Sequence, residues 1–424
     1  MKVREGYKMT EFGLIPNEWD IRKFENIVEK ITDGTHKTPV YTDNGVPFLR
    51  VTDIQDSCID WNNVKYISKE EHTDLIRRCK PEKGDILYSK NGTIGIPKIV
   101  DWDKEFSIFV SLCLIKIKKN GSEVFNKFLE SFLASDCCLN QIKMRAKQGT
   151  VTNLHLEEIR ELLIPLPPIP EQQRIAEILS SNDTLISKTA ELIEKTKEVK
   201  QGLMQELLTK GIGHTEFKES ELGRIPKEWV IKPLSNVTDY VDYRGKTPAK
   251  SDDGMFLITA KNIKQGFIDY DCSKEYVLFS EYEQIMKRGK PQIGDVLITT
   301  EAPCGNVAQI DKTDIALAQR VIKYRGYEDC LDNTFLKYYL LGDSFQSRLI
   351  YLSTGGTVKG IKGSILHQML LLLPSLEEQN EIATILSSVD KKLQTLTKRK
   401  QQLEEIKQGL MQDLLTGRVR VNLN

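Results

Sequence analysis

The chain has 424 residues, of which 40% are hydrophobic and 28% charged, a composition typical of a globular protein rather than a disordered one. Sixty basic residues balance sixty acidic ones, so net charge alone gives no attraction to nucleic acid. The longest aliphatic run, 369–373, is far shorter than the roughly 20 residues of a membrane span, and the N-terminus carries no secretion signal. We therefore expect a cytoplasmic protein.

The sequence contains an internal repeat, in which one unit occurs twice. The repeated segments are EFGLIPNEW and ELGRIPKEW at 11–19 and 221–229, KPEKGDIL and KPQIGDVL at 80–87 and 290–297, and KQGLMQELLT and KQGLMQDLLT at 200–209 and 407–416. Their order is the same, and the displacement changes only from 210 to 207 residues. Because the stretches between these anchors have diverged, each half combines a constant part with a variable part.

In the first half, residues 20–165 contain short runs rich in Ile, Val, Phe and Tyr, separated by Gly, Asn and Asp. Such runs predict strands and turns, with a helix over 122–147, and therefore a mixed α/β domain. The segment IPLPPIP at 164–170 predicts an extended linker.

Residues 171–209 and 378–416 each predict one long helix of about 57 Å, at 1.5 Å per residue. Apolar residues of the second helix recur every seven positions, which predicts a coiled-coil seam. They are Ile382, Val389, Leu396, Leu403 and Leu410. In the first helix the heptad run is instead Ile178, Leu185, Leu192 and Val199, because Asn182, Thr189 and Thr196 take the equivalent places. We therefore expect the two helices to bury different faces.

We find no enzyme motif in the sequence. RGKT at 244–247 lacks the earlier glycine of a phosphate-binding loop, and neither G-x-S-x-G nor a methyltransferase motif is present. The eight cysteines and five histidines show no metal-ligand spacing. We expect no catalytic residue and no metal site in this chain.

Local windows that carry bases without acids recur in both halves, at 140–153, 243–250 and 354–364. Glycine-rich backbone can approach a phosphate, Lys and Arg neutralise it, and Asn, Gln, Arg and Lys can read base edges. The candidate DNA contacts are Lys37, Lys90, Asn91, Thr93, Lys143, Arg145, Lys147, Gln148, Arg244, Lys246, Lys250, Asn306, Thr357, Lys359 and Lys362. Taken singly, each cluster also fits a solvated surface turn.

The whole pattern resembles the specificity subunit of type I restriction-modification systems. The residues that carry the resemblance are the paired openings, the GDIL and GDVL segments, the GTV loops, the IPEQQRIAEILSS segment with its partner LEEQNEIATILSS, and the KQGLMQ endings. The resemblance implies an α+β fold in which two α/β target recognition domains in tandem repeat are separated by two long antiparallel coiled-coil helices with pseudo-twofold symmetry. Its parts would be target recognition domain 1 at 1–170, a central helix at 171–213, target recognition domain 2 at 214–374 and a C-terminal helix at 375–424.

The resemblance also implies a function and a set of partners. Each recognition domain would read one half of a bipartite double-stranded DNA target, and the chain itself would be non-catalytic. Two modification subunits would methylate adenine at N6 with S-adenosylmethionine, and restriction subunits would translocate and cut DNA with ATP and magnesium. We expect no cofactor in this chain.

Helices of about 57 Å would place the two DNA contacts at most about 17 base pairs apart. Two other interpretations remain open at this stage. One is a coiled-coil adaptor with two globular heads that binds no DNA, and the other is an enzyme with a divergent site.

Overall fold

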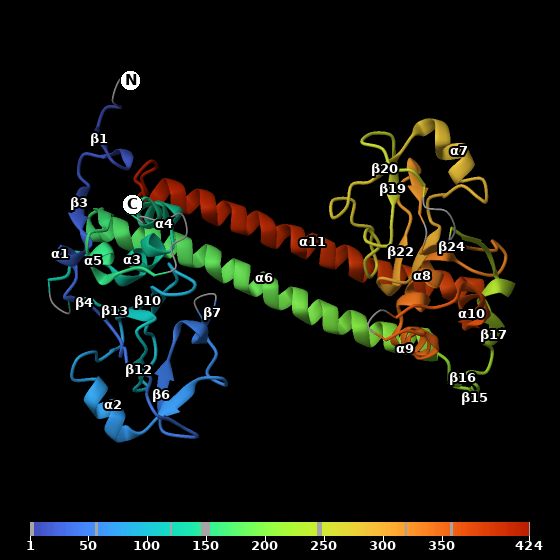
Figure 1. Cartoon of the computed structure of the whole chain (residues 1–424), viewed down its shortest axis with the longest axis horizontal. Helices are drawn as coiled ribbons and strands as arrows, with labels where there is room; N and C mark the ends of the chain where they lie inside the picture. Colours follow the sequence, from blue (N-terminus) through green and yellow to red (C-terminus); the bar gives the residue numbers. More distant parts are fainter. Residues whose placement is uncertain are drawn as a thin grey trace. The chain divides into compact units, whose positions relative to one another are not determined.

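The computed structural model describes residues 4–55, 58–118, 121–145, 153–243, 248–318, 320–356 and 359–423. The chain divides into two compact units. Unit 1 comprises Met1–Ala190 with Lys398–Asn424, and unit 2 comprises Glu191–Thr397. Two long helices, α6 (Ile169–Lys210) and α11 (Leu376–Leu414), each contribute one part to each unit (Figure 1).

Two four-stranded sheets form the body of unit 1. The first has the order β11-β10-β13-β4, and all its neighbouring strands are antiparallel. The second has the order β12-β6-β9-β5, in which β12 and β6 are parallel. The strands are β4 (Lys30–Asp33), β5 (Tyr41–Thr42), β6 (Val46–Leu49), β9 (Lys65–Ile67), β10 (Ile86–Ser89), β11 (Pro97–Ile99), β12 (Ser107–Ile108) and β13 (Leu112–Lys116).

Unit 2 repeats this topology. Its antiparallel sheet has the order β18-β24-β21-β22, and its second sheet has the order β20-β19-β23 with β19 and β23 parallel. The strands are β18 (Thr238–Asp242), β19 (Met255–Ile258), β20 (Tyr276–Val277), β21 (Val296–Thr300), β22 (Cys304–Gln309), β23 (Ile315–Leu317) and β24 (Val321–Gly326). The matching strand orders confirm that the sequence repeat is a structural repeat.

Two-stranded pairs and short helices complete each unit. In unit 1 they are β1 (Tyr7–Thr10), β2 (Gly13–Pro16), β3 (Asp20–Lys23), β14 (Leu163–Leu166), β7 (Ile54–Gln55), β8 (Cys58–Ile59), α1 (Phe24–Ile27), η1 (Val51–Asp53), α2 (Lys69–Leu75), α3 (Asn126–Leu133), α4 (Asp136–Arg145) and α5 (Leu156–Arg160). In unit 2 they are β15 (Phe217–Ser220), β16 (Gly223–Pro226), β17 (Val230–Pro233), β25 (Leu370–Leu373), η2 (Leu234–Asn236), η3 (Phe279–Glu281), α7 (Tyr282–Ile285), α8 (Asn333–Leu341), α9 (Asp343–Leu352) and α10 (Gly363–Gln368).

The helix predicted over 122–147 is two helices, α3 and α4, with a break at Ala134 and Ser135. The Ser135 hydroxyl accepts a hydrogen bond from the Cys138 amide at 3.3 Å, an N-cap that starts a new helix. The proline segment also differs from the expected linker. Its first part is strand β14, which pairs with β3, and α6 begins within it at Ile169. Pro170 is tolerated there because first-turn amides need no partner inside the helix.

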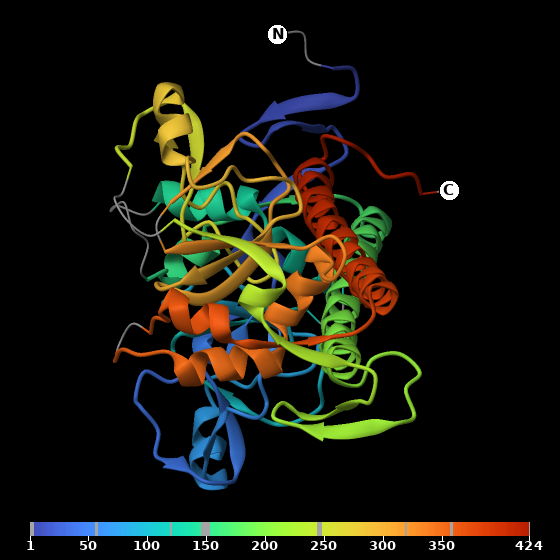
Figure 2. The same cartoon turned by 90° about the vertical axis from the view of Figure 1, so that its right-hand side faces the viewer.

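Within each unit, α6 and α11 lie side by side and run antiparallel (Figure 1, Figure 2). In unit 1, Asp183 of α6 pairs with Lys407 of α11 at 2.5 Å. In unit 2, Lys200 of α6 pairs with Asp390 of α11 at 2.5 Å. These two ion pairs join repeat-equivalent residues, since 183 and 390, like 200 and 407, differ by 207. The repeat therefore extends to the contacts between the helices.

The expectation that the two helices bury different faces is wrong. Asn182, Thr189 and Thr196 are buried. Of their equivalents in α11, Leu396 is buried, and Val389 and Leu403 are partly buried. By contrast, Leu185, Leu192 and Val199 are between 42% and 56% exposed. The two helices therefore bury equivalent faces, formed by the same positions of the repeat.

Internal hydrogen bonds explain why polar residues are accepted in the seam. The Asn182 side-chain amide donates to the Leu403 carbonyl at 3.0 Å. The Thr189 and Thr196 hydroxyls donate to the carbonyls four residues earlier, each at 2.7 Å. A polar group that is hydrogen-bonded can be buried at little cost, so the apolar heptad pattern alone does not identify the buried face.

At the start of each long helix, a glutamate accepts a hydrogen bond from the tryptophan of the opening motif. In unit 1, Glu171 accepts hydrogen bonds from the Trp19 indole at 3.1 Å and from Arg420 at 2.9 Å. In unit 2 its equivalent, Glu378, accepts from the Trp229 indole at 3.0 Å. The opening motif of each half thus carries a tryptophan because its indole nitrogen reaches this carboxylate.

Replacing Glu171 by Ala is expected to destabilise unit 1 by about 2–3 kcal/mol, because the buried Trp19 indole and Arg420 lose their acceptor. The measurement is urea unfolding followed by tryptophan fluorescence. Glu177→Ala is the matched control on the same helix, since Glu177 is exposed and forms a surface ion pair with Arg174 in the neighbouring turn. Equal effects of the two substitutions would contradict the role given to Glu171.

Candidate functional site

Three segments of unit 1 are connected to one another by backbone hydrogen bonds, and we call this group of segments loop frame 1. Its members are the β10–β11 loop at 90–96, Ser111 before β13, and Asn153 with Leu154. The Lys90 amide donates to the Ser111 carbonyl at 3.0 Å, and the Leu154 amide donates to the Lys90 carbonyl at 2.8 Å. Asn91 and Asn153 form an isolated antiparallel bridge. The structure thus brings the loop with the predicted contacts Lys90, Asn91 and Thr93 next to Asn153, the last residue of the window 140–153.

Unit 2 contains the same arrangement, loop frame 2, formed by 300–304, Arg320, 354–356 and 359–361. The Thr300 amide donates to the Arg320 carbonyl at 2.9 Å, and the Ile361 amide donates to the Thr300 carbonyl at 2.9 Å. Glu301 and Gly360 form the bridge that corresponds to Asn91 and Asn153. Each unit therefore presents a repeat-equivalent set of loops at the end of its antiparallel sheet.

Lys359 and Lys362 project from loop frame 2 and its edge. The amides and carbonyls of Thr354 and Gly360 exchange two hydrogen bonds of 2.9 Å, which closes a short loop. Lys359 lies in this loop and is exposed. Lys362 is exposed too and occupies the N-cap position of α10. Two exposed lysines in and next to one loop suit contact with a phosphate group.

The other predicted contacts are distributed as follows. Lys37, Thr93 and Lys143 are exposed in unit 1, and Asn91 is partly buried. Lys250 is exposed in unit 2 and pairs with Glu275 at 2.9 Å. The predictions for Lys147, Gln148, Arg244, Lys246, Thr357 and the side chain of Arg145 lie outside the described residues.

The structure places Lys90 and Asn306 differently from the expectation of open surface contacts. Lys90 is buried, with its ammonium nitrogen 3.5 Å from an Asp33 carboxylate oxygen. Its equivalent, Thr300, is buried as well, so this position supports the loop in both units. The Asn306 amide donates to the Ile263 carbonyl at 2.7 Å and accepts from Gln265 at 3.1 Å. Both polar ends of Asn306 therefore have partners inside the chain.

Sequence reasoning missed Arg320. It lies outside the three basic windows, in a segment rich in apolar residues that is typical of a strand of the sheet. The backbone pairing of β21 and β24 nevertheless brings it to loop frame 2, with its Nε 3.5 Å from a Glu301 carboxylate oxygen. Only the fold shows that these two residues are neighbours.

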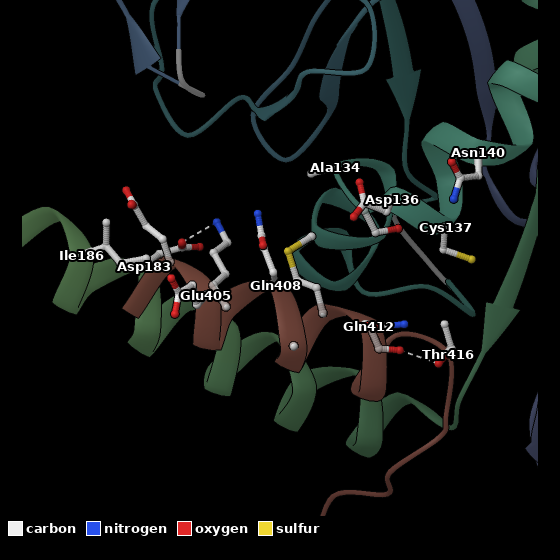
Figure 3. Close-up of a pocket in the computed structure, with 15 residues that line it drawn as sticks. Ala134, Asp136, Cys137, Asn140, Asp183, Ile186, Glu405, Gln408, Gln412 and Thr416 are labelled. Atoms are coloured by element: carbon white, nitrogen blue, oxygen red, sulfur yellow. Dashed lines mark hydrogen bonds and ion pairs between the residues drawn. The ribbon is translucent and has the colours of Figure 1, made fainter. Parts of the chain in front are cut away.

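A second kind of site lies on the long helices. In unit 1, a groove of about 1040 Å³ is lined by the start of α4, by Asp183 and Ile186 of α6, by residues between Glu404 and Gln412 of α11, and by Thr416 just after α11. Figure 3 shows Asp136 and Cys137 of α4 across the groove from Gln408 and Gln412 of α11. Burial raises the pKa of the Cys137 thiol to about 11, so this cysteine is a packing residue rather than a nucleophile.

The corresponding place in unit 2 holds two smaller hollows of about 290 and 250 Å³. Their lining includes the repeat equivalents of the groove residues in unit 1. These equivalent pairs are Lys200 and Lys407, Gln201 and Gln408, Met204 and Met411, Gln205 and Gln412, and Thr209 and Thr416. The polar residues of each pair are identical although surface residues elsewhere in the halves differ.

Within the described ranges, no group of three or more His, Cys, Asp and Glu side chains is arranged to hold a metal ion. Among the same residues, no helix is long and apolar enough to cross a membrane.

The comparisons with known proteins agree with this architecture. The model of the type I restriction modification DNA specificity domain matches residues 16–198 and again 226–405. The MjaVIII specificity subunit of Methanocaldococcus jannaschii, a type I restriction enzyme, is 28% identical over 99% of this chain and 97% of its own length. The EcoKI specificity subunit of Escherichia coli is 22% identical, with 87% of this chain and 82% of its own length covered.

Among solved structures, the type I restriction-modification S subunit from M. genitalium has a TM-score of 0.56 at 15% identity, and 98% of each chain is covered. That likeness shows a shared fold. The two matches to a DNA specificity domain define the class of this chain, a DNA-recognition protein. The chain belongs to the type I restriction-modification DNA specificity family, and its function is the recognition of DNA sequence.

Proposed function

We propose that this chain is the specificity subunit of a type I restriction-modification complex and that it reads a bipartite DNA target, one half-site with each recognition domain. The observation that carries the proposal is the occurrence of an equivalent loop frame in each unit. One frame with one set of side chains can read a few base pairs, and a second frame with different side chains reads a second half-site.

The partners follow from the groove on the long helices. A solvent-facing glutamine or glycine has no folding reason to be the same in both halves. Its identity in both copies therefore favours two copies of one partner protein, each docked on one groove. We propose that these are modification subunits, which would methylate adenine at N6, and that restriction subunits join the same complex.

In this proposal the chain itself carries out no chemical step. Its own residues bind DNA and position the partners. S-adenosylmethionine, ATP and magnesium would act in the modification and restriction subunits. The assembly would work in the cytoplasm, where a bacterial or archaeal chromosome is accessible.

Binding of the purified chain to duplex DNA tests the DNA role directly. Lys359→Ala should weaken binding evenly across sequences and reduce the slope of log K against log salt by about 0.9, because one phosphate contact is lost. Lys391→Ala, at an exposed lysine of α11, is the matched control and should leave the slope unchanged.

A change in the preferred sequence of Lys359→Ala with unchanged affinity would contradict the phosphate role. An adaptor with two heads would show no salt-dependent binding in any of these variants. An enzyme with a divergent site would show activity as an isolated chain, whereas this proposal requires a modification subunit.

A further inference from the structure

The two loop frames share their backbone and differ in the side chains that the backbone presents. In loop frame 1 the positions at the β10–β11 loop and before β13 are Asn91 and Ser111. The equivalent positions of loop frame 2 are Glu301 and Arg320, placed by the same backbone hydrogen bonds. A constant backbone with changed polar side chains is what two readers of different base sequences require.

The backbone at Arg320 is held in an uncommon conformation. Arg320 has a φ of 70°, and Ala302, next to Glu301, has a φ of 50°. Among the described residues these are the two non-glycine residues with positive φ, and both lie in loop frame 2. A left-handed backbone is unfavourable for such residues and persists where the surrounding structure enforces it, often at binding sites.

The surrounding structure does enforce it here. The Thr300 amide and hydroxyl both donate to the Arg320 carbonyl, at 2.9 and 3.3 Å. Thr300 itself is buried in β21, so the carbonyl of Arg320 is tied to the sheet. This fixes the direction in which the side chain leaves the loop, as a residue that reads a base edge needs.

The guanidinium of Arg320 is available to a ligand. Its side chain is 48% exposed, and the 3.5 Å separation from Glu301 is longer than a hydrogen bond. A long, solvent-exposed ion pair contributes little to stability, so Arg320 can leave Glu301 and bind a ligand at little cost in free energy. By contrast, Arg325, five residues further along the chain in β24, donates two hydrogen bonds to buried Asp295 and so already has its partner within the fold.

We propose that Arg320 is a specificity-determining residue that donates to O6 and N7 of a guanine in the half-site read by unit 2. Glu301 is the positioning residue that keeps the guanidinium at the loop before DNA arrives. Two parallel N–H donors match these two guanine acceptors in the major groove, and no other base pair offers the same pair of acceptors at one base. The inference rests on the proposed function, since it needs the half-site to be read by this unit.

The experiment is to co-express the full chain with its modification subunit and map methylated sites for the wild type and three variants. Arg320→Ala should make one G·C pair of one half-site unspecified, with a loss of discrimination on the order of tenfold to a hundredfold. Arg320→Lys should lose part of the discrimination at this base pair, and Arg320→Gln should shift the preference there toward adenine. The other half-site should be unchanged in all three.

Arg224→Ala is the control, because Arg224 is an exposed arginine on the β15–β16 hairpin, and it should leave the whole target unchanged. If Arg320→Ala lowers the yield of folded chain, Arg320→Lys and Arg320→Gln still report on the same base pair, because both keep a polar side chain at this position. An unchanged target in the Arg320 variants would overturn the proposal, as would an even loss of affinity across all sequences. A wild-type complex that yields no methylated target would refute the proposed function as well, and is recognised before any variant is compared.

Discussion

Replacing Gly202 and Gly409 together by Trp is expected to abolish methylation by the complex, because neither modification subunit can then dock. Gly409 lines the groove of unit 1, and Gly202 is its equivalent on α6. Both are exposed, and a Cβ built on either would meet no atom within 4 Å. A large side chain therefore changes the surface without straining this chain.

The pair also allows a stepwise test. Either single Trp variant should leave one modification subunit bound per specificity chain, measured by native mass spectrometry, and the double variant should leave none. The matched controls are Gly202→Ala and Gly409→Ala, which should bind normally and stabilise each helix by roughly 0.5–1 kcal/mol. Two subunits bound to the double Trp variant would show that the partners dock elsewhere.

Lengthening both long helices by one heptad is expected to change the target while keeping both half-sites. The insertions are seven residues between Ala190 and Glu191 of α6 and seven between Thr397 and Lys398 of α11. One heptad preserves the seam, adds about 10.5 Å and should lengthen the spacer between the half-sites by about three base pairs. The measurement is the methylated motif of the lengthened complex.

An insertion in α6 alone is the control for this prediction. It would shift α6 against α11 and separate the ion pairs Asp183–Lys407 and Lys200–Asp390, so it should impair assembly rather than lengthen the spacer. A lengthened complex with altered half-sites, or with an unaltered spacer, would show that the helices do not set the distance.

Much of the fold could be predicted from the sequence because the chain repeats itself. The displacement of about 210 residues, the two long helices and the mixed α/β character of each half all follow from local patterns. The buried face of α6 could not, because Asn182, Thr189 and Thr196 satisfy their polar groups internally and so occupy places that the heptad pattern assigns to apolar residues.

The candidate site was predictable only in part. Basic windows located Lys359 and Lys362, which loop frame 2 presents to solvent. The same reasoning included Lys90, because the sequence does not show that Asp33, 57 positions earlier, forms an ion pair with it. Arg320 was overlooked for the converse reason, since its partners at the site, Thr300 and Glu301, come from a distant part of the sequence.

The most direct test of the central claim is to co-express this chain with the modification subunit and to map methylated adenines across the host genome by long-read sequencing. We predict a split motif with an unspecified spacer, which disappears when this chain is omitted. A stable complex of the two proteins that produces no new methylation would contradict the account and favour an adaptor.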